Sequence, residues 1–151
     1  MKISVLWVGR TKEKFIKEAI KKYIKDIQTM AGIEIVEVKE GKGAFSENRK
    51  PAAVLFEEGG RILRQAGDFI LLDDAGKMMS SMEFSGLLRD KSSCRFVLGG
   101  PYGVSPQVKE AASLRLSLSP MTFPHELARV ILLEQVYRGL SIIKGKGYHH
   151  A

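Results

Sequence analysis

The last eight residues of the chain, KGKGYHHA, gather side chains that can bind or react. Its polar members are Lys144, Lys146, Tyr148, His149 and His150. No acidic residue follows Glu134, whereas Arg138 precedes the tail. A basic, acid-free end of this kind favours a polyanionic partner such as RNA. The residues alone fit equally well a terminal segment that has no function.

A second candidate lies in FVLGGPYGVS, residues 96–105, where an apolar run enters a glycine turn before a helix. In a parallel α/β sheet, ligands bind beyond the carboxyl ends of the strands. Gly99, Gly100 and Gly103 allow a close backbone approach to a ligand or a positive φ. Pro101 removes one backbone donor, and the spacing is not that of a dinucleotide-binding loop. Taken alone, the segment fits a structural turn as well as a binding loop.

Two more apolar runs end in segments that can line a site. LLDDAGK, residues 71–77, offers Leu72 and Gly76. LSLSPMTFPHELAR mixes small, apolar and hydroxyl side chains that could hold an aromatic base by packing and by backbone hydrogen bonds. The loop within it consists of Ser119, Pro120, Met121, Thr122 and Phe123. His125, which follows Pro124, is expected to orient this loop rather than to act as a base.

The residue inventory disfavours several kinds of chemistry. A zinc site needs about four ligands, or three and a water, and the chain has only three histidines and one cysteine; we expect no metal. Neither a phosphate-binding P-loop nor a GxSxG nucleophile turn is present, which argues against NTP-driven chemistry and simple hydrolysis. Cys94 lies in an apolar run and is expected to pack as a small hydrophobic side chain.

Hydrophobic periodicity predicts alternating elements that would position these segments. Strands are expected at 2–8, 33–38, 68–74, 94–100 and 114–119, and helices at 12–28, 51–65, 80–89, 105–113 and 124–143. Thr11 is expected to cap the first helix, and Ser80 with Glu83 has capping-box spacing. A polar, basic loop fills 41–50. The alternation predicts an α/β fold with a mainly parallel sheet and helices on both faces.

Length and composition bound the remaining possibilities. The 151 residues fit one domain spanning 1–151. No apolar run reaches the ~18 residues that a membrane span needs, and the first residues lack the pattern of a signal peptide, so a cytoplasmic protein is expected. The net charge of +7 favours a polyanion. The lysines between 12 and 25 are interpreted as a solvated helix face.

The helix expected at 124–143 is apolar around more than one stripe. A surface that wide exceeds what one sheet face covers, and a second copy of the chain is the simplest further partner. The alternative is a helix that is deeply buried within one chain.

These segments together resemble a known family. VLGGPYGVSPQV, LSLSPMTFPHELARVILLEQVYRGLSI and the terminal GYHH are similar to the SPOUT-type RNA methyltransferases. Among these, the chain is similar to the small ribosomal RNA large subunit methyltransferase H family, which methylates N3 of a pseudouridine in 23S ribosomal RNA. The resemblance covers essentially the whole chain, and the combination of motifs is specific. It implies a C-terminal trefoil knot, an S-adenosylmethionine cofactor, a homodimer, and a substrate in the 70S ribosome or its large subunit.

The resemblance also implies roles for residues. The cofactor would contact Leu72, Gly76, Gly99, Gly100 and Leu118 to Phe123. The family match places Arg138, Tyr148 and His149 in the active site. His149 is the best candidate base because histidine titrates near physiological pH; Tyr148 could stack on or hydrogen-bond to a flipped base, and Arg138 could hold phosphate or a uracil anion. Arg129, Lys144 and Lys146 are expected to contact RNA. His150 stands where relatives often carry arginine, and its role stays open.

Two other functions compete with RNA methylation. One is a non-catalytic ribosome- or RNA-binding protein with the same fold, which the intact GGP loop and YH tail argue against. The other is a metabolic α/β enzyme that acts on a small anion, which the acid-free tail argues against.

Overall fold

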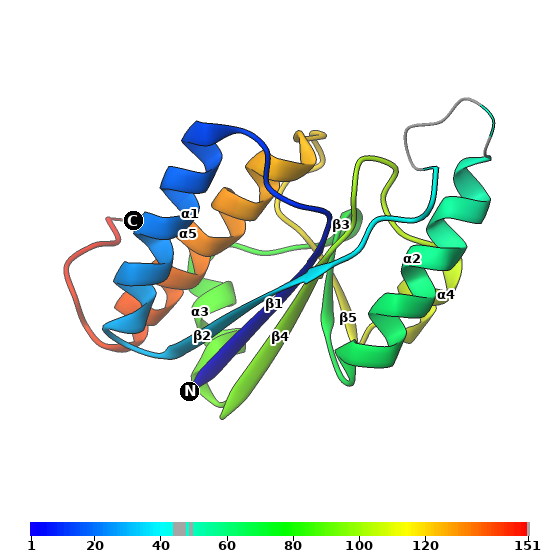
Figure 1. The fold of residues 1–151 in the computed structure, drawn as a ribbon. Helices are drawn as coiled ribbons and strands as arrows, with labels where there is room; N and C mark the ends of the chain where they lie inside the picture. The colour runs from blue at the N-terminus through cyan, green and yellow to red at the C-terminus, as the bar shows by residue number, and fades with distance from the viewer. Residues whose placement is uncertain (44–47, 49, 151) are drawn as a thin grey trace.

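The computed structural model describes residues 1–43, 48 and 50–150, in which strands and helices alternate (Figure 1). The strands are β1 (Lys2–Val8), β2 (Gly32–Val38), β3 (Ile70–Met78), β4 (Ser93–Leu98) and β5 (Leu114–Ser117). The helices are α1 (Lys14–Gln28), α2 (Pro51–Ala66), α3 (Ser81–Arg89), α4 (Pro106–Ala111) and α5 (His125–Ile143). Each predicted element is confirmed, with shifts at its ends. Of the predicted loop 41–50, residues 44–47 and 49 lie outside the described residues.

The strands form one sheet in the order β2-β1-β4-β3-β5. The pairings β1–β2, β1–β4, β3–β4 and β3–β5 are all parallel. The predicted parallel α/β sheet is therefore confirmed. Because the strands point the same way, the loops after β3, β4 and β5 leave from one edge, where ligands of such sheets bind.

Helices cover both faces of the sheet, as predicted. Figure 1 shows α1, α3 and α5 on one face and α2 and α4 on the other. The side chains of β1 alternate between the two layers: Ile3, Val5 and Trp7 join the core under α1 and α5, whereas Leu6 and Val8 join the core under α2. This alternation is the period-two pattern of a strand that is buried on both sides.

Helix α5 lies between α1 and α3 on its face of the sheet. Leu132, Leu133, Val136 and Leu140 are all between 0% and 3% exposed. Contacts within one chain therefore bury most of the apolar surface of α5, and the breadth of that surface is not by itself evidence for a second copy.

Thr11 does not cap α1, because the N-cap residue of this helix is Glu13, which makes no side-chain cap hydrogen bond. The Glu126 carboxylate Oε1 accepts hydrogen bonds from the backbone N–H groups of Lys12, at 3.0 Å, and Glu13, at 3.1 Å. The Thr11 hydroxyl instead accepts a hydrogen bond from Arg129. The predicted Thr11 cap was wrong because the helix begins at Lys14, beyond the reach of a Thr11 cap, and the Thr11 hydroxyl accepts from Arg129 instead. The predicted Ser80–Glu83 capping box is confirmed.

Strand β3 extends past its predicted end at residue 74 and carries a bulge. Leu72 and Lys77 both lie opposite Leu116 of β5, so residues 73–76 have no partner in the ladder. A Cβ atom on Gly76 would lie 2.6 Å from the carbonyl carbon and oxygen of Arg115. Glycine is therefore required where the bulged strand crosses β5.

Two further details follow from close packing. A Cβ atom on Gly59 would lie 2.5 Å from the Ser105 hydroxyl, so this glycine lets α2 approach the start of α4. Cys94 is 6% exposed, which confirms its predicted place in the core, and burial raises the pKa of its thiol to about 11.

Candidate functional site

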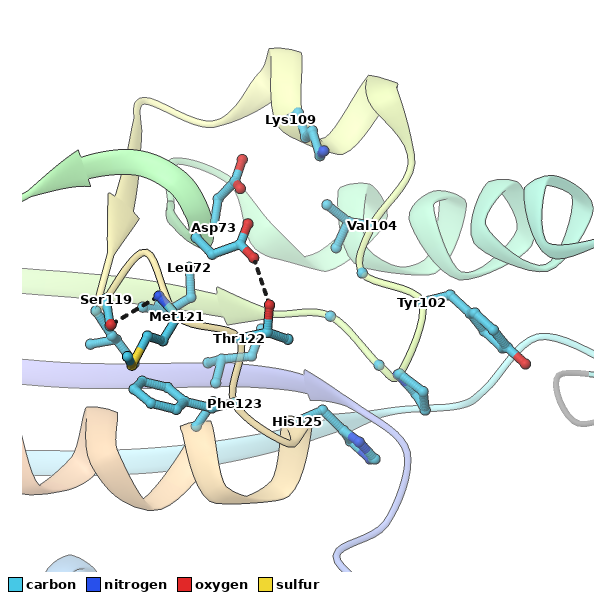
Figure 2. Close-up of a pocket in the computed structure, with 18 residues that line it drawn as sticks. Leu72, Asp73, Tyr102, Val104, Lys109, Ser119, Met121, Thr122, Phe123 and His125 are labelled. Atoms are coloured by element: carbon cyan, nitrogen blue, oxygen red, sulfur yellow. Dashed lines mark hydrogen bonds between the residues drawn. The ribbon is translucent and has the colours of Figure 1, made fainter.

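The loops after β3, β4 and β5 enclose a cavity of about 400 Å³ (Figure 2). It lies at the sheet edge where the sequence placed a ligand site. The predicted residues that line it are Leu72, Gly99, Gly100, Leu118, Ser119, Met121, Thr122 and Phe123. The structure thus brings together three segments that are distant in sequence. The size of the cavity is within the usual range for small-molecule sites, about 300–1,000 Å³.

Gly76 and Pro120 are not among the lining residues. Gly76 is needed for the close crossing of β3 over β5 rather than for a ligand contact. Its role as a cofactor-binding residue stays a prediction, whereas its packing fixes the path of the strand.

The glycine turn after β4 closes on itself. The N–H of Gly103 donates to the carbonyl of Gly100 at 3.0 Å, and Gly103 has a φ of 79°, which favours glycine. A Cβ atom on Gly99 would overlap the carbonyl oxygen of Gly103. A Cβ on Gly100 would instead meet Val8 of β1 at 3.6 Å, an ordinary contact away from the cavity. Gly99 and Gly103 therefore shape this wall of the pocket.

Polar side chains that sequence reasoning did not single out also line the cavity: Asp73, Asp74, Tyr102 and Lys109. Asp74 joins two loops, because its carbonyl accepts from Ser117 Oγ at 3.0 Å and its Oδ2 accepts from Thr122 Oγ1 at 3.5 Å. Adjacent acids at the carboxyl end of a strand were a signal available in LLDDAGK. The bulge in β3 that turns these two side chains into the pocket could not be read from the sequence.

His125 lies in the wall of the cavity at the start of α5. Burial, and secondly the nearby Arg129 guanidinium, lower the pKa of His125 below its ordinary value. The imidazole is therefore held neutral at pH 7. Its position, directly after the 119–123 loop, is compatible with the loop-orienting role expected from the sequence.

The tail residues Arg138, Tyr148 and His149 meet on the surface of α5. Arg138 Nε donates to Glu134 Oε1 at 3.0 Å, and the Tyr148 hydroxyl donates to the same oxygen at 3.1 Å. The Arg138 guanidinium lies over the Tyr148 ring, 4.8 Å from its centroid. Glu134, which sequence reasoning missed, joins the group; its position four residues before Arg138 was the available signal.

Hydrogen bonds link the members of the tail cluster, which consists of Glu134, Arg138, Tyr148 and His149. Arg138 Nη1 lies 3.1 Å from His149 Nδ1. Because an arginine can only donate, Nδ1 must accept, and a neutral His149 then carries its proton on Nε2. Burial, followed by the charge of Glu134, raises the pKa of Tyr148 to about 12. The Tyr148 hydroxyl therefore stays a donor to Glu134.

The tail cluster and the cavity are separate within one chain. His125 and Arg138 are 13 residues apart on α5, which corresponds to about 20 Å along the helix axis. No tail residue lines the cavity among those described, and Figure 1 shows the described segment after α5 beside α1 and α5. One copy of the chain therefore does not join the two halves of the predicted site.

Arg129 is not an RNA contact. Its side chain is 0% exposed, its Nη1 donates to Thr11 Oγ1 at 2.8 Å, and its Nη2 donates to the Val8 carbonyl at 2.7 Å. The guanidinium also lies over the Trp7 ring. This prediction is corrected because the charged group is buried between α5 and β1. Lys144 and Lys146 are exposed at the end of α5, and their RNA contacts stay predictions, as does the role of His150.

The described residues hold neither a metal-ligand group nor a membrane-spanning helix. No group of three or more His, Cys, Asp or Glu side chains within that part of the chain could hold a metal ion. Within the same residues, no helix has the length and apolar character needed to cross a membrane.

Comparisons with known proteins agree with one another. The family model described as "Predicted SPOUT methyltransferase" matches residues 1–149. A protein of Thermodesulfovibrio yellowstonii named ribosomal RNA large subunit methyltransferase H is 49% identical over 150 residues, covering 99% of both chains. Proteins of the same name from Clostridium botulinum and Geotalea uraniireducens are 42% and 39% identical, and each alignment covers 99% of this chain and at least 99% of the relative.

One solved structure shares the fold. Lpg2936 of Legionella pneumophila, described as a "putative methyltransferase" and solved with the bound cofactor SAM, superposes with a TM-score of 0.52. The match covers 90% of this chain and 65% of that one at 14% identity, so it bears on the fold alone.

Proposed function

The chain belongs to the ribosomal RNA large subunit methyltransferase H family of SPOUT methyltransferases, and from this premise we propose that it methylates N3 of a pseudouridine in 23S ribosomal RNA. The observation that carries the proposal is the 49% identity to a relative of that name over 99% of both chains. The methyl donor is S-adenosylmethionine, which supplies a methyl group already activated by the positive charge on sulfur.

The cavity fits this donor. Leu118 and Phe123 offer an apolar wall to the adenine, and the glycine turn offers backbone groups for its edge. Asp73 Oδ2 is a buried acceptor without a hydrogen-bond donor. The work left to the protein is to hold donor and base in line and to favour loss of the N3 proton.

The tail cluster supplies the second contribution. The pseudouridine N3–H is a weakly acidic imide, and its loss leaves negative charge on the ring oxygens. Arg138, Tyr148 and His149 Nε2–H are three donors that can stabilise this charge, while Glu134 holds two of them in place. We therefore assign His149 to anion stabilisation rather than to the base role favoured from the sequence.

A homodimer would join the two halves of the site. If two α5 helices pack antiparallel about a two-fold axis, the ~20 Å between His125 and Arg138 brings each tail to the other chain's cavity. Exposed apolar side chains around α5 support such a contact: Met82 is 51%, Met121 74% and Leu127 36% exposed.

The remaining parts of the proposal concern topology and place. The segment after β5 runs along the β3 bulge, with Ser117 bonded to Asp74, before α5 continues on the face opposite α4. This crossing supports a C-terminal trefoil knot in one domain spanning 1–151. The substrate is the 70S ribosome or its large subunit, contacted in part by Lys144 and Lys146, and the protein acts in the cytoplasm.

The test uses ribosomes from cells that lack this protein. Purified protein and S-adenosylmethionine are added to 70S ribosomes, to large subunits or to free 23S RNA, and the digested RNA is analysed by mass spectrometry. We expect a methylated pseudouridine in RNA from at least one assembled particle. Binding of the particle and the cofactor without any transfer would favour the non-catalytic alternative, and a methyl group on another nucleoside would refute the substrate assignment.

A further inference from the structure

One wall of the cavity holds a buried carboxylate oxygen that lacks a donor. The Asp73 side chain is 8% exposed; its Oδ1 accepts from the Ala75 N–H at 3.0 Å, and its Oδ2 has no hydrogen-bond partner. The Arg115 Nη1 lies 3.6 Å from Oδ2, which balances charge but is too long for a hydrogen bond. Because buried acceptors are nearly always satisfied, Oδ2 indicates a donor on the ligand.

The two other unpartnered buried atoms among the described residues do not point to this cavity. They are Trp7 Nε1 and Arg129 Nε, and both belong to donors in the core between α5 and β1. Asp73 differs because it lines the cavity and offers an acceptor. The ligand group that completes it must therefore carry an N–H or O–H.

Lys109 provides the opposite charge on the same side of the cavity. It lines the cavity from α4, its side chain is exposed, and no ion pair to it occurs within the described part of the chain. Figure 2 shows the Lys109 ammonium and Asp73 on the side of the pocket away from Phe123. The cavity thus has an apolar side and a side that carries one negative and one positive group.

We propose that Asp73 and Lys109 form a subsite for the zwitterionic amino-acid end of the methyl donor. Asp73 Oδ2 accepts from the α-ammonium, and Lys109 Nζ neutralises the α-carboxylate. The adenine is then left to the apolar side formed by Leu118 and Phe123. This inference rests on the proposed function in one respect only, the identity of the donor.

Binding measurements on the intact protein test the subsite without any need for methyl transfer. The probes are S-adenosylhomocysteine, which has the amino-acid end, and 5′-methylthioadenosine, which lacks it. For Asp73→Asn, and separately for Lys109→Met, titration calorimetry should show affinity for S-adenosylhomocysteine reduced about tenfold or more. Affinity for 5′-methylthioadenosine should stay within about twofold, since its adenosine contacts are unchanged.

The controls separate a local effect from a damaged pocket. Glu110→Gln changes the neighbouring exposed residue on α4, which does not line the cavity, and should leave both affinities unchanged. Retained binding of 5′-methylthioadenosine shows that each variant is folded. An equal loss for both probes would assign Asp73 to the ribose hydroxyls and overturn the proposal, as would no loss for either probe. If the unaltered protein binds neither probe, the proposed function itself fails.

Discussion

Burial divides the two arginines of α5 into different roles. Arg129 is fully buried and donates to Thr11 and to the Val8 carbonyl, whereas the Arg138 side chain is 25% exposed and holds the tail through Glu134. Both occur in the same broadly apolar helix, and residue type alone does not separate their roles. Arg129 is the costlier to replace, since its partners are buried acceptors.

Arg129→Met should destabilise the fold without altering RNA contacts. The substitution leaves the Val8 carbonyl and the Thr11 hydroxyl without their donor, at a cost of about 1–3 kcal/mol for each group that stays unpaired. Urea unfolding measures the loss, with exposed Lys144→Met as the control. In ribosome binding, the slope of log affinity against log salt should change for Lys144→Met but not for Arg129→Met. A changed slope for Arg129→Met with an unchanged slope for Lys144→Met would instead place Arg129 at the RNA interface.

Tyr148 should lose its place in the tail cluster only at high pH. Its pKa in the folded protein is raised to about 12, above the ~10 of an unfolded chain. The folded state thus favours the protonated phenol, so this contribution is full below pH ~10 and is lost as the pH rises through ~12. An ultraviolet phenolate titration of the protein minus that of Tyr148→Phe isolates this group. A difference curve centred near 10 would contradict the docked tail.

The Glu134→Gln variant separates the two main causes of the raised Tyr148 pKa. Burial is the larger cause of the raised Tyr148 pKa, and the Glu134 charge is the next. Replacing the carboxylate by an amide should therefore move the titration only part of the way back. A full return to the ordinary value would mean that the tail has detached.

At the scale of elements, the β3 bulge decides the shape of the pocket. It turns Asp73 and Asp74 toward the cavity and brings the Asp74 carbonyl to Ser117. The bulge can exist only because Gly76, which has no side chain, lets β3 pass close to the backbone of β5. A residue that lines no cavity thus sets the position of several that do.

Two glycine substitutions should have opposite effects. Gly76→Ala places a Cβ 2.6 Å from the Arg115 carbonyl group, and relieving such an overlap with backbone costs about 1–3 kcal/mol or more. Gly86→Ala in α3 meets no atom within 4 Å and should stabilise the fold by about 0.5–1 kcal/mol, since alanine favours a helix interior. Thermal and urea unfolding would measure both. A neutral Gly76→Ala would show that the bulge can move away from β5.

The sequence was informative where a signal is local. Alternating apolar runs, the Ser80–Glu83 box and the glycine turn predicted the order of the elements, the sheet class and the three loops that enclose the pocket. It failed where distant residues meet: the Thr11 hydroxyl accepts from Arg129 instead of capping α1, and the bulge extended β3 beyond residue 74. Burial of Arg129 and the lone Asp73 Oδ2 likewise depend on tertiary packing, which periodicity does not report.

At the scale of the whole molecule, the distance along α5 is the main constraint on mechanism. The cavity lies at the start of the helix and the tail cluster near its end, about 20 Å apart. Since α5 is packed between α1 and α3, it cannot bend to close this gap. A second chain related by a two-fold axis meets the requirement with no change in either fold.

Mixed dimers should recover activity from two inactive chains. Thr122→Trp fills the cavity, and Arg138→Ala removes the central donor of the tail cluster; each homodimer should be inactive. Dimers that carry one chain of each kind, isolated through two different affinity tags, retain one intact cavity that faces one intact tail. They should therefore show about half the activity of the unaltered dimer, because one of two equivalent sites survives. A mixed dimer of Arg138→Ala with Tyr148→Phe, both in the tail, is the control and should regain no such site. If the cavity and the tail of the same chain worked together, the first mixture would stay as inactive as its parents.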